Sequence, residues 1–268
     1  MESGQHIFLS PHYDDAALSC GGLLAQLSAA GESCVVATLF GGKPDYERLS
    51  PFAAMIHRRP QAGEDPIDQR RAEERHSLAI LGAEGRPGDY LDCIYRQDST
   101  EKRWLYASEA ALFGAVDPDE DALVAELAQC LAALAPAPAN CTLYAPLAIG
   151  NHVDHQIARR SATILQRHGF DVLYYEDYPY VARDPEGFER SLGGQAERSR
   201  WKKQLALLSP AALQGKIEAV LAYPSQLGVL FPGAGDVRQR VSAALHGQAE
   251  QTGQGRLAER LWRSPSAY

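Results

Sequence analysis

The sequence predicts an α/β fold, because short apolar segments typical of strands alternate with longer segments typical of helices. Gly31, Gly82 and Gly169 each follow a predicted helix, at the position where helix C-terminal caps favour glycine. Such alternation is typical of parallel βαβ units with right-handed crossovers. We therefore expect a Rossmann-like three-layer α/β/α sandwich with a mostly parallel sheet.

The first strand is expected over residues 6–10, where an apolar run ends at Ser10 and Pro11. Two long polar loops, residues 41–65 and 92–117, follow the second and third strands, and loops at that place are typically binding walls or lids. The other strands are expected over residues 34–40, 89–91, 141–145 and 172–175, and helices over residues 15–30, 66–81, 119–135 and 155–168.

We expect a single domain over residues 1–268, with a core at about residues 5–180 and a helical C-terminal extension at about residues 196–268. In the extension, the sequence predicts helices over residues 198–208 and 210–222. A chain of 268 residues is long enough to bury a sizeable core in one α/β domain.

The composition, 45% hydrophobic and 22% charged residues, is typical of a globular protein. The net charge of -8, without clustered Lys and Arg, argues against a nucleic-acid partner. The five cysteines are odd in number and form no CxxC pair, which indicates a reducing compartment. No segment approaches the roughly 18 apolar residues of a membrane span, and the first strand begins too early for a leader. We therefore expect a cytoplasmic enzyme.

Histidine and aspartate residues follow two of the predicted strands. Residues 12–15 (His-Tyr-Asp-Asp) follow the first strand, and residues 151–155 (Asn-His-Val-Asp-His) follow the fourth, each just before a helix. In a sheet ordered 3-2-1-4-5, these strands are neighbours and their connections leave to opposite faces, which makes a crevice at their carboxyl ends. The two segments are therefore expected to meet there, although they lie far apart in the sequence.

Three of these side chains are suited to hold a metal ion. His12, Asp15 and His155 offer two imidazole nitrogens and one carboxylate oxygen. Catalytic zinc sites use three such ligands and keep a fourth position for water. Fe²⁺ or another divalent ion remains an alternative to Zn²⁺, because affinity and availability compete.

The remaining members of the two segments are suited to proton transfer. Asp14 is placed to take a proton from water, whose pKa a zinc ion lowers. His152 is the candidate donor to the oxyanion and to the departing amine of an amide. Asp154 is expected to orient His152.

Each of these residues, taken alone, could instead have a purely structural role. A single histidine is more often a hydrogen-bonded structural residue than a ligand, and an Asp-Asp pair is commonly a helix N-cap. Two His/Asp segments, each between a strand and a helix, favour the metal site over these structural roles.

The chain resembles the PIG-L/LmbE-like zinc-dependent N-deacetylases, which include the N-acetylglucosaminyl-phosphatidylinositol deacetylase and the deacetylases and amidases of mycothiol metabolism. Two further elements agree with the family: an Arg-x-x-Glu helix and a Ser-Gln element near the C-terminal end. The resemblance rests on Ser10-Pro11-His12-Tyr13-Asp14-Asp15, Cys20-Gly21-Gly22, His152-Val153-Asp154-His155, Arg70-Arg71-Ala72-Glu73-Glu74 and Tyr223-Pro224-Ser225-Gln226.

The resemblance implies a Rossmann-like fold and a substrate that bears an N-acyl amino sugar. It also implies metal binding by His12, Asp15 and His155, with Asp14 as general base and His152 as the electrophilic or general-acid histidine. The chain departs from the family at positions 13 and 16, which hold Tyr and Ala where the family often has Pro and an acid. We associate that acid with substrate hydroxyl contacts, so the departure concerns the sugar pose and not the metal chemistry.

Two residues are candidates for substrate binding. Arg70 could bind a phosphate or hydroxyl of the substrate, although an Arg-Glu pair on a helix is commonly a structural ion pair. Tyr178 belongs to an aromatic run after the fifth strand and could stack on a sugar ring, although such runs also pack in cores. No GxGxxG or Walker sequence is present, which argues against NAD or ATP.

The sequence therefore predicts a zinc hydrolase that removes an N-acetyl group from an N-acetylglucosamine-type amino sugar or its conjugate. An amidase acting on a thiol conjugate or another non-acetyl amide is one alternative, and a non-catalytic sugar- or nucleotide-binding α/β module is another. The expected partner is a small-molecule substrate. The sequence does not decide between a monomer and a homo-oligomer.

Overall fold

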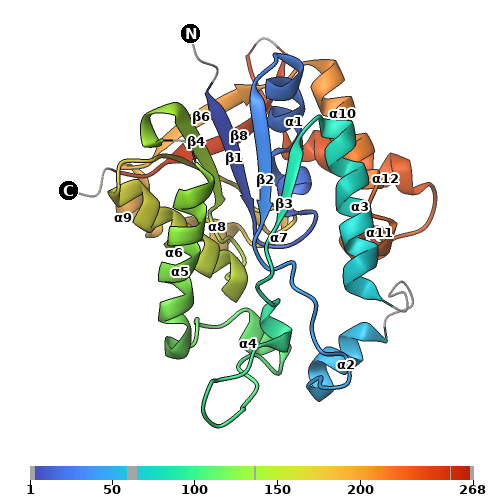
Figure 1. Ribbon diagram of the computed structural model, residues 1–268. Helices are drawn as coiled ribbons and strands as arrows, with labels where there is room; N and C mark the ends of the chain where they lie inside the picture. Colours follow the sequence, from blue (N-terminus) through green and yellow to red (C-terminus); the bar gives the residue numbers. More distant parts are fainter. Residues whose placement is uncertain (1–3, 59–64, 136, 254, 266–268) are drawn as a thin grey trace.

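The computed structural model describes residues 4–58, 65–135, 137–253 and 255–265. In this part of the chain, one eight-stranded sheet forms the centre of the molecule (Figure 1). Its strands are β1 (Gln5–Ser10), β2 (Ser33–Thr38), β3 (Glu84–Pro87), β4 (Cys141–Pro146), β5 (Asp171–Tyr175), β6 (Lys202–Leu207), β7 (Glu250–Gln251) and β8 (Leu257–Arg263). They are ordered β3-β2-β1-β4-β5-β8-β6, and β7 pairs with β8.

Helices cover both faces of this sheet (Figure 1). The α-helices are α1 (Asp15–Ala29), α2 (Pro51–His57), α3 (Pro66–Leu81), α4 (Glu109–Leu112), α5 (Asp121–Leu134), α6 (Val153–Arg167), α7 (Tyr180–Arg183), α8 (Pro185–Ser191), α9 (Gly194–Arg198), α10 (Pro210–Leu221), α11 (Pro224–Leu230) and α12 (Val237–Gln248). Three short 3₁₀ helices are η1 (Cys93–Tyr95), η2 (Pro118–Glu120) and η3 (Pro138–Asn140).

The two faces of β1 show how the layers form. Ile7 and Leu9 pack into a core with α5 and α6, whereas Phe8, which points to the opposite face, packs with α1, α3 and α10. Both faces are therefore buried, as is usual for parallel strands. The predicted three-layer α/β/α sandwich is confirmed.

The first five strands are parallel and lie in the predicted order 3-2-1-4-5. Helix α3 has the predicted bounds, begins with Pro66 after its cap Asp65, and ends at Gly82 in the left-handed conformation with φ of 69°. None of the helices in the described ranges is both long and apolar enough to span a bilayer.

The prediction of the third strand over residues 89–91 is wrong. The strand is β3, a few residues earlier, and Asp89 forms only an isolated bridge with Phe40. All four residues of β3 are exposed, because β3 lies at the edge of the sheet and pairs only with β2. An exposed edge strand leaves no apolar pattern for the sequence to reveal.

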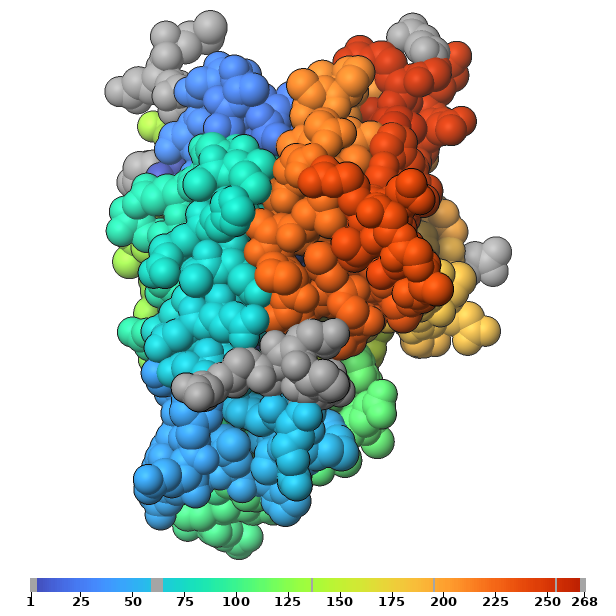
Figure 2. Space-filling model, turned by 90° about the vertical axis from the view of Figure 1, so that its right-hand side faces the viewer, coloured from blue at the N-terminus to red at the C-terminus, as the bar shows by residue number. Residues whose placement is uncertain are grey.

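The prediction of a helix over residues 198–208 is also wrong, and the region after residue 196 is not purely helical. Residues 202–207 form β6, and β8 inserts between β5 and β6 in antiparallel orientation. Helices α10, α11 and α12 make up most of the rest, and Figure 2 shows this C-terminal part lying against α3. The half-exposed β6 lacks a buried face that would distinguish it from a surface helix.

A buried ion pair connects the C-terminal region to α1. The carboxylate of Glu259 in β8 accepts hydrogen bonds from Lys216 Nζ at 2.7 Å and from the backbone N–H groups of Gly22 and Leu23 at 3.1 and 2.7 Å. These amides are free because α1 is kinked at Cys20, whose φ is −137°. A Cβ at Gly22 would lie 3.0 Å from Glu259 Oε1 and 2.7 Å from Leu208, so the contact requires glycine.

We predict that Glu259→Ala lowers the free energy of unfolding by about 3–5 kcal/mol, because it leaves the Lys216 ammonium buried without its partner. Urea denaturation measures this change. Glu250→Ala, which removes a solvent-accessible pair with Lys203, is the control and should cost at most about 1 kcal/mol. Equal losses in the two variants would contradict the prediction.

Candidate functional site

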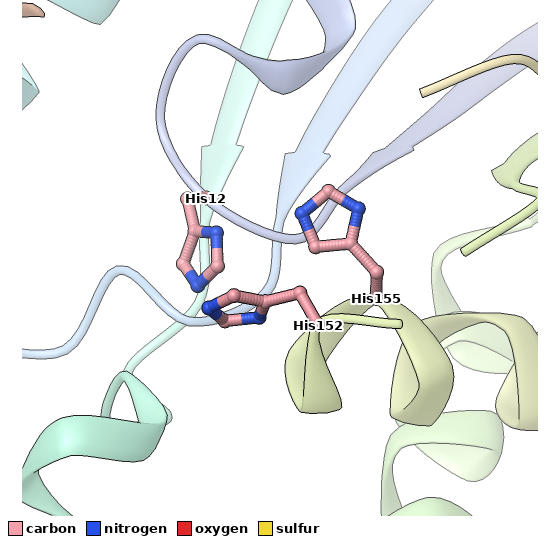
Figure 3. A group of neighbouring side chains, drawn as sticks. All are labelled: His12, His152 and His155. Carbon is pink, nitrogen blue, oxygen red and sulfur yellow. The ribbon is translucent and has the colours of Figure 1, made fainter. Parts of the chain in front are cut away.

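The two predicted His/Asp segments meet at the carboxyl ends of β1 and β4. His12 lies in the loop after β1, and His152 and His155 lie at the start of α6. Figure 3 shows the three imidazole rings turned toward one another, and they offer nitrogen atoms that lie within 4.8 Å of one another. The expected convergence of the segments is therefore present.

Asp15 lies between two of these rings. Its Oδ2 atom is 3.4 Å from His12 Nδ1 and 3.3 Å from His155 Nε2. Ligands of a tetrahedral ion with bonds of about 2.0–2.1 Å are separated by about 3.3–3.4 Å. His12, Asp15 and His155 thus fit a divalent metal ion with two nitrogen ligands and one oxygen ligand.

The other nitrogen of each ligand histidine contacts a buried carboxylate. His12 Nε2 lies 2.8 Å from Asp154 Oδ2, and His155 Nδ1 lies 2.6 Å from Asp177 Oδ1. Such contacts fix the ring orientation and the tautomer of metal-binding histidines. They leave His12 Nδ1 and His155 Nε2 facing Asp15, as metal binding requires.

The electrostatics favour a cation at this place. Burial by itself lowers the pKa of His155, but Asp15 and Asp177 raise it to about 10. Burial likewise opposes charging of His12, but Asp92, Asp15 and Asp154 raise its pKa well above the usual range. The carboxylates thus draw protons onto both rings, and a divalent ion would take the place of those protons.

The carboxylate of Asp154 has partners other than the His152 ring. It contacts His12 and forms an ion pair with Arg96 at 2.6 Å. Arg96 is paired in turn with Glu120. The backbone N–H of Asp154 does donate to the His152 ring, so the role of Asp154 in orienting His152 stays a prediction. The sequence could not reveal the pairing of Asp154 with Arg96, because Arg96 comes from the loop after η1.

His152 is the N-cap of α6. Its Nδ1 accepts the backbone N–H of Asp154 at 3.3 Å, so the ring proton of the neutral form belongs on Nε2. Burial and the neighbouring His12 lower the pKa of His152 to about 3. The side chain is therefore a neutral imidazole with an N–H available as hydrogen-bond donor.

Asp14 has a strained backbone. Its φ is 94°, a region that costs a non-glycine residue about 1–3 kcal/mol and is common at functional sites. Arg70 lies 3.3 Å from the Asp14 carboxylate and donates to the carbonyl of Tyr13 at 2.5 Å. Burial and the adjacent Asp15 raise the pKa of Asp14 to about 7, although Arg70 lowers it. A carboxylate with this pKa suits proton transfer near neutral pH.

A cavity of about 200 Å³ opens beside these residues. Arg70 lines it, together with Asp92, whose carboxylate is 3.7 Å from His12 Nε2. Its other polar lining includes His57, Tyr95, Ser225 and Gln226. The predicted candidate Arg70 therefore faces both Asp14 and the cavity.

Tyr178, the second predicted substrate contact, lies elsewhere. Its side chain is 6% exposed and stacks on Phe231, with ring centroids 5.8 Å apart, in the core beneath α10 and α12. The structure thus places Tyr178 in packing and not at the cavity, which corrects the prediction. Tyr180, two residues later, lies near the predicted ligand His155, with its ring 5.8 Å from that of His155.

Asp177 was not among the predicted site residues. It follows β5, the strand next to β4, and it is fully buried. The only signal in the sequence was its place after a strand, the same signal that identified residues 12–15.

The α/β fold thus brings together, at the carboxyl ends of its parallel strands, histidines and carboxylates that fit a divalent metal ion. Residues 7–165 match the PIG-L family, described as GlcNAc-PI de-N-acetylase, and the chain belongs to this family. Its membership confirms the resemblance that the sequence motifs indicated.

Named relatives include two 2'-N-acetylparomamine deacetylases. That of Niallia circulans is 30% identical over 238 residues, 84% of this chain and 82% of the relative. That of Streptomyces fradiae is 33% identical over 197 residues, 72% of this chain and 63% of the relative. Among solved structures, the zinc-inhibited form of teicoplanin deacetylase Orf2 is similar, with a TM-score of 0.79, 27% identity, and coverage of 96% of this chain and 97% of that one.

We predict that His155→Ala abolishes stoichiometric metal binding and that Asp177→Asn weakens it by about 10–100-fold, because Asp177 holds the ligand in place. Elemental analysis and competition with a chelator measure both effects. His168→Ala, an exposed histidine at the far end of α6, is the matched control and should bind metal normally. Full metal occupancy in His155→Ala would refute the ligand assignment.

Proposed function

We propose that the chain is a zinc-dependent hydrolase that removes the N-acetyl group from an N-acetylglucosamine-type amino sugar or its conjugate. The observation that carries the proposal is the position of Asp15 Oδ2, 3.3–3.4 Å from nitrogens of both His12 and His155, with Asp14 next in the chain. Membership in a de-N-acetylase family and the deacetylase activity named for the relatives support it.

His12, Asp15 and His155 would hold the ion. A bound divalent metal would polarise the amide carbonyl and make water easier to deprotonate. Asp14 takes the proton from the attacking water, since its carboxylate has a pKa of about 7 and is held by Arg70 beside the ligands. The same proton is then available for the departing amine, which must leave in protonated form.

His152 stabilises the oxyanion by donating its Nε2–H. The neutral tautomer set by the N-cap hydrogen bond keeps this donor in place through the reaction, and its burial strengthens the interaction. A donor of this kind is worth about 10²–10³ in turnover in other acyl-transfer sites.

The sugar occupies the cavity beside Asp92 and Arg70. Arg70 lines this cavity and its side chain is 20% exposed, so its guanidinium is able to donate to a substrate hydroxyl or carbonyl. Asp92, which lines the same cavity next to His12, would accept hydrogen bonds from sugar hydroxyl groups.

We predict that Asp14→Asn keeps the fold and the bound metal but lowers kcat by at least about 10²-fold, because the amide cannot accept a proton. Metal content and acetate release are measured on the same preparation. The matched control is Asp89→Asn, a fully exposed aspartate whose change should leave kcat unaltered. Wild-type turnover by Asp14→Asn would exclude Asp14 as the base.

The function itself is tested by acetate release from a panel of N-acetylated amino sugars, after the apoprotein is reloaded with one equivalent of Zn²⁺, Fe²⁺, Co²⁺ or Mn²⁺. We expect acetate with Zn²⁺ and at least one N-acetylglucosamine derivative. Release of a larger acid from a thiol conjugate, without acetate, would favour the amidase alternative. A purified protein that binds no metal and hydrolyses none of the panel would contradict the proposal.

A further inference from the structure

The strained backbone of Asp14 is held from the far side by Glu74 of α3. The backbone N–H of Asp14 donates to Glu74 Oε2 at 3.3 Å. Arg70, one turn earlier on the same helix, holds the carbonyl of Tyr13 and the carboxylate of Asp14. The peptide before Asp14 is therefore held at both its N–H and its C=O by one helix.

Glu74 is itself fixed by two hydroxyl groups. The Tyr223 hydroxyl donates a short hydrogen bond to Glu74 Oε2, the oxygen that also accepts from Asp14, and the Thr38 hydroxyl donates to Oε1 at 3.2 Å. Glu74 is 6% exposed and Tyr223 1% exposed, so water does not compete for these bonds. The position of the shared oxygen is thus set jointly by Tyr223 and Asp14.

Tyr223 is anchored in the C-terminal region. It precedes α11, and two residues later the N–H and hydroxyl of Ser225 donate to Glu73 at 3.0 and 2.5 Å. Adjacent carboxylates of α3 therefore each hold one residue of this segment. The arrangement gives a role to Glu73, Glu74 and the Tyr-Pro-Ser-Gln element, which the proposed function does not use.

We propose that Tyr223, acting through Glu74, is a positioning residue for Asp14, so that the C-terminal region sets the geometry of the general base. The inference rests on the proposed function, in which Asp14 accepts the proton. Tyr223 packs its ring among Leu78, Ala219 and their neighbours, and only its hydroxyl reaches Glu74. Removal of that oxygen therefore moves the carboxylate and the Asp14 amide while the packing stays.

The two histidine ligands are held by a separate set of contacts. His12 and His155 hydrogen-bond to Asp154 and Asp177, which come from α6 and the loop after β5. A change at Tyr223 should therefore separate turnover from metal binding, whereas a general loss of stability would affect both.

The experiment compares Tyr223→Phe with Tyr144→Phe in the metal-loaded protein. Tyr144 belongs to the same buried cluster, and its hydroxyl bonds His6 near the opposite end of β1. We expect Tyr223→Phe to lower kcat by at least about ten-fold, since small misplacements of catalytic groups are costly, with metal affinity and KM within about two-fold of wild type. Tyr144→Phe should retain wild-type kcat.

Glu74→Gln provides a second route and a double-mutant test. If Tyr223 acts through Glu74, the Tyr223→Phe change should cost no further kcat in the Glu74→Gln background. Additive losses would overturn the inference, as would a Tyr223→Phe variant with the turnover of Tyr144→Phe or with metal loss that accounts for its lower rate. These results differ from failure of the proposed function itself, which would show as full activity of Asp14→Asn.

Discussion

The whole site depends on negative charge buried at the carboxyl ends of β1, β4 and β5. Asp14, Asp15, Asp154 and Asp177 are each less than 8% exposed and lie in one region. Such a concentration of carboxylates is stable only if cations or hydrogen-bond donors compensate it. Two histidines, Arg70 and Arg96 supply part of that compensation, and a divalent ion would supply the rest.

The cations and donors that compensate this charge also give Asp14 and Asp15 different roles. Asp15 and Asp14 are adjacent, yet the histidines hold the pKa of Asp15 well below its usual range against the effect of burial, whereas the pKa of Asp14 is raised to about 7. One carboxylate is therefore kept ionised for binding a cation, and the other is able to exchange a proton. The two roles differ because Asp15 faces His12 and His155, whereas Asp14 faces Arg70.

The sequence predicted the parallel core and the convergence of His12, Asp15 and His155 because both depend on local patterns. Buried strands show as apolar runs, and His12, Asp15 and His155 closely follow such runs. The wrong predictions concern features set by distant contacts. Strands β3 and β6 lie at the two edges of the sheet and lack a buried face. The pairing of Asp154 with Arg96, which the sequence did not reveal, likewise depends on a loop far away in the sequence.

Asp177 and Tyr178 show, within one short segment, that distant contacts decide where a side chain points. Both follow β5, but Asp177 lies beneath His155 and Tyr178 points into the core on Phe231. Residues that leave a strand can turn to either side, and no periodicity in the sequence specifies the direction. Only the packing of α10 and α12 decides it.

The insertion of β8 between β5 and β6 has a consequence for the order in which the protein forms during synthesis. The parallel strands β1 to β5 are complete by residue 175, but the free edge of β5 is covered only by residues 257–263. A nascent chain therefore exposes an unpaired strand edge until residues 257–263 have been synthesised, and such edges invite pairing with other chains. The synthesis of β8, and not the earlier appearance of residues 12–15 and 152–155, is therefore the step at which the sheet closes.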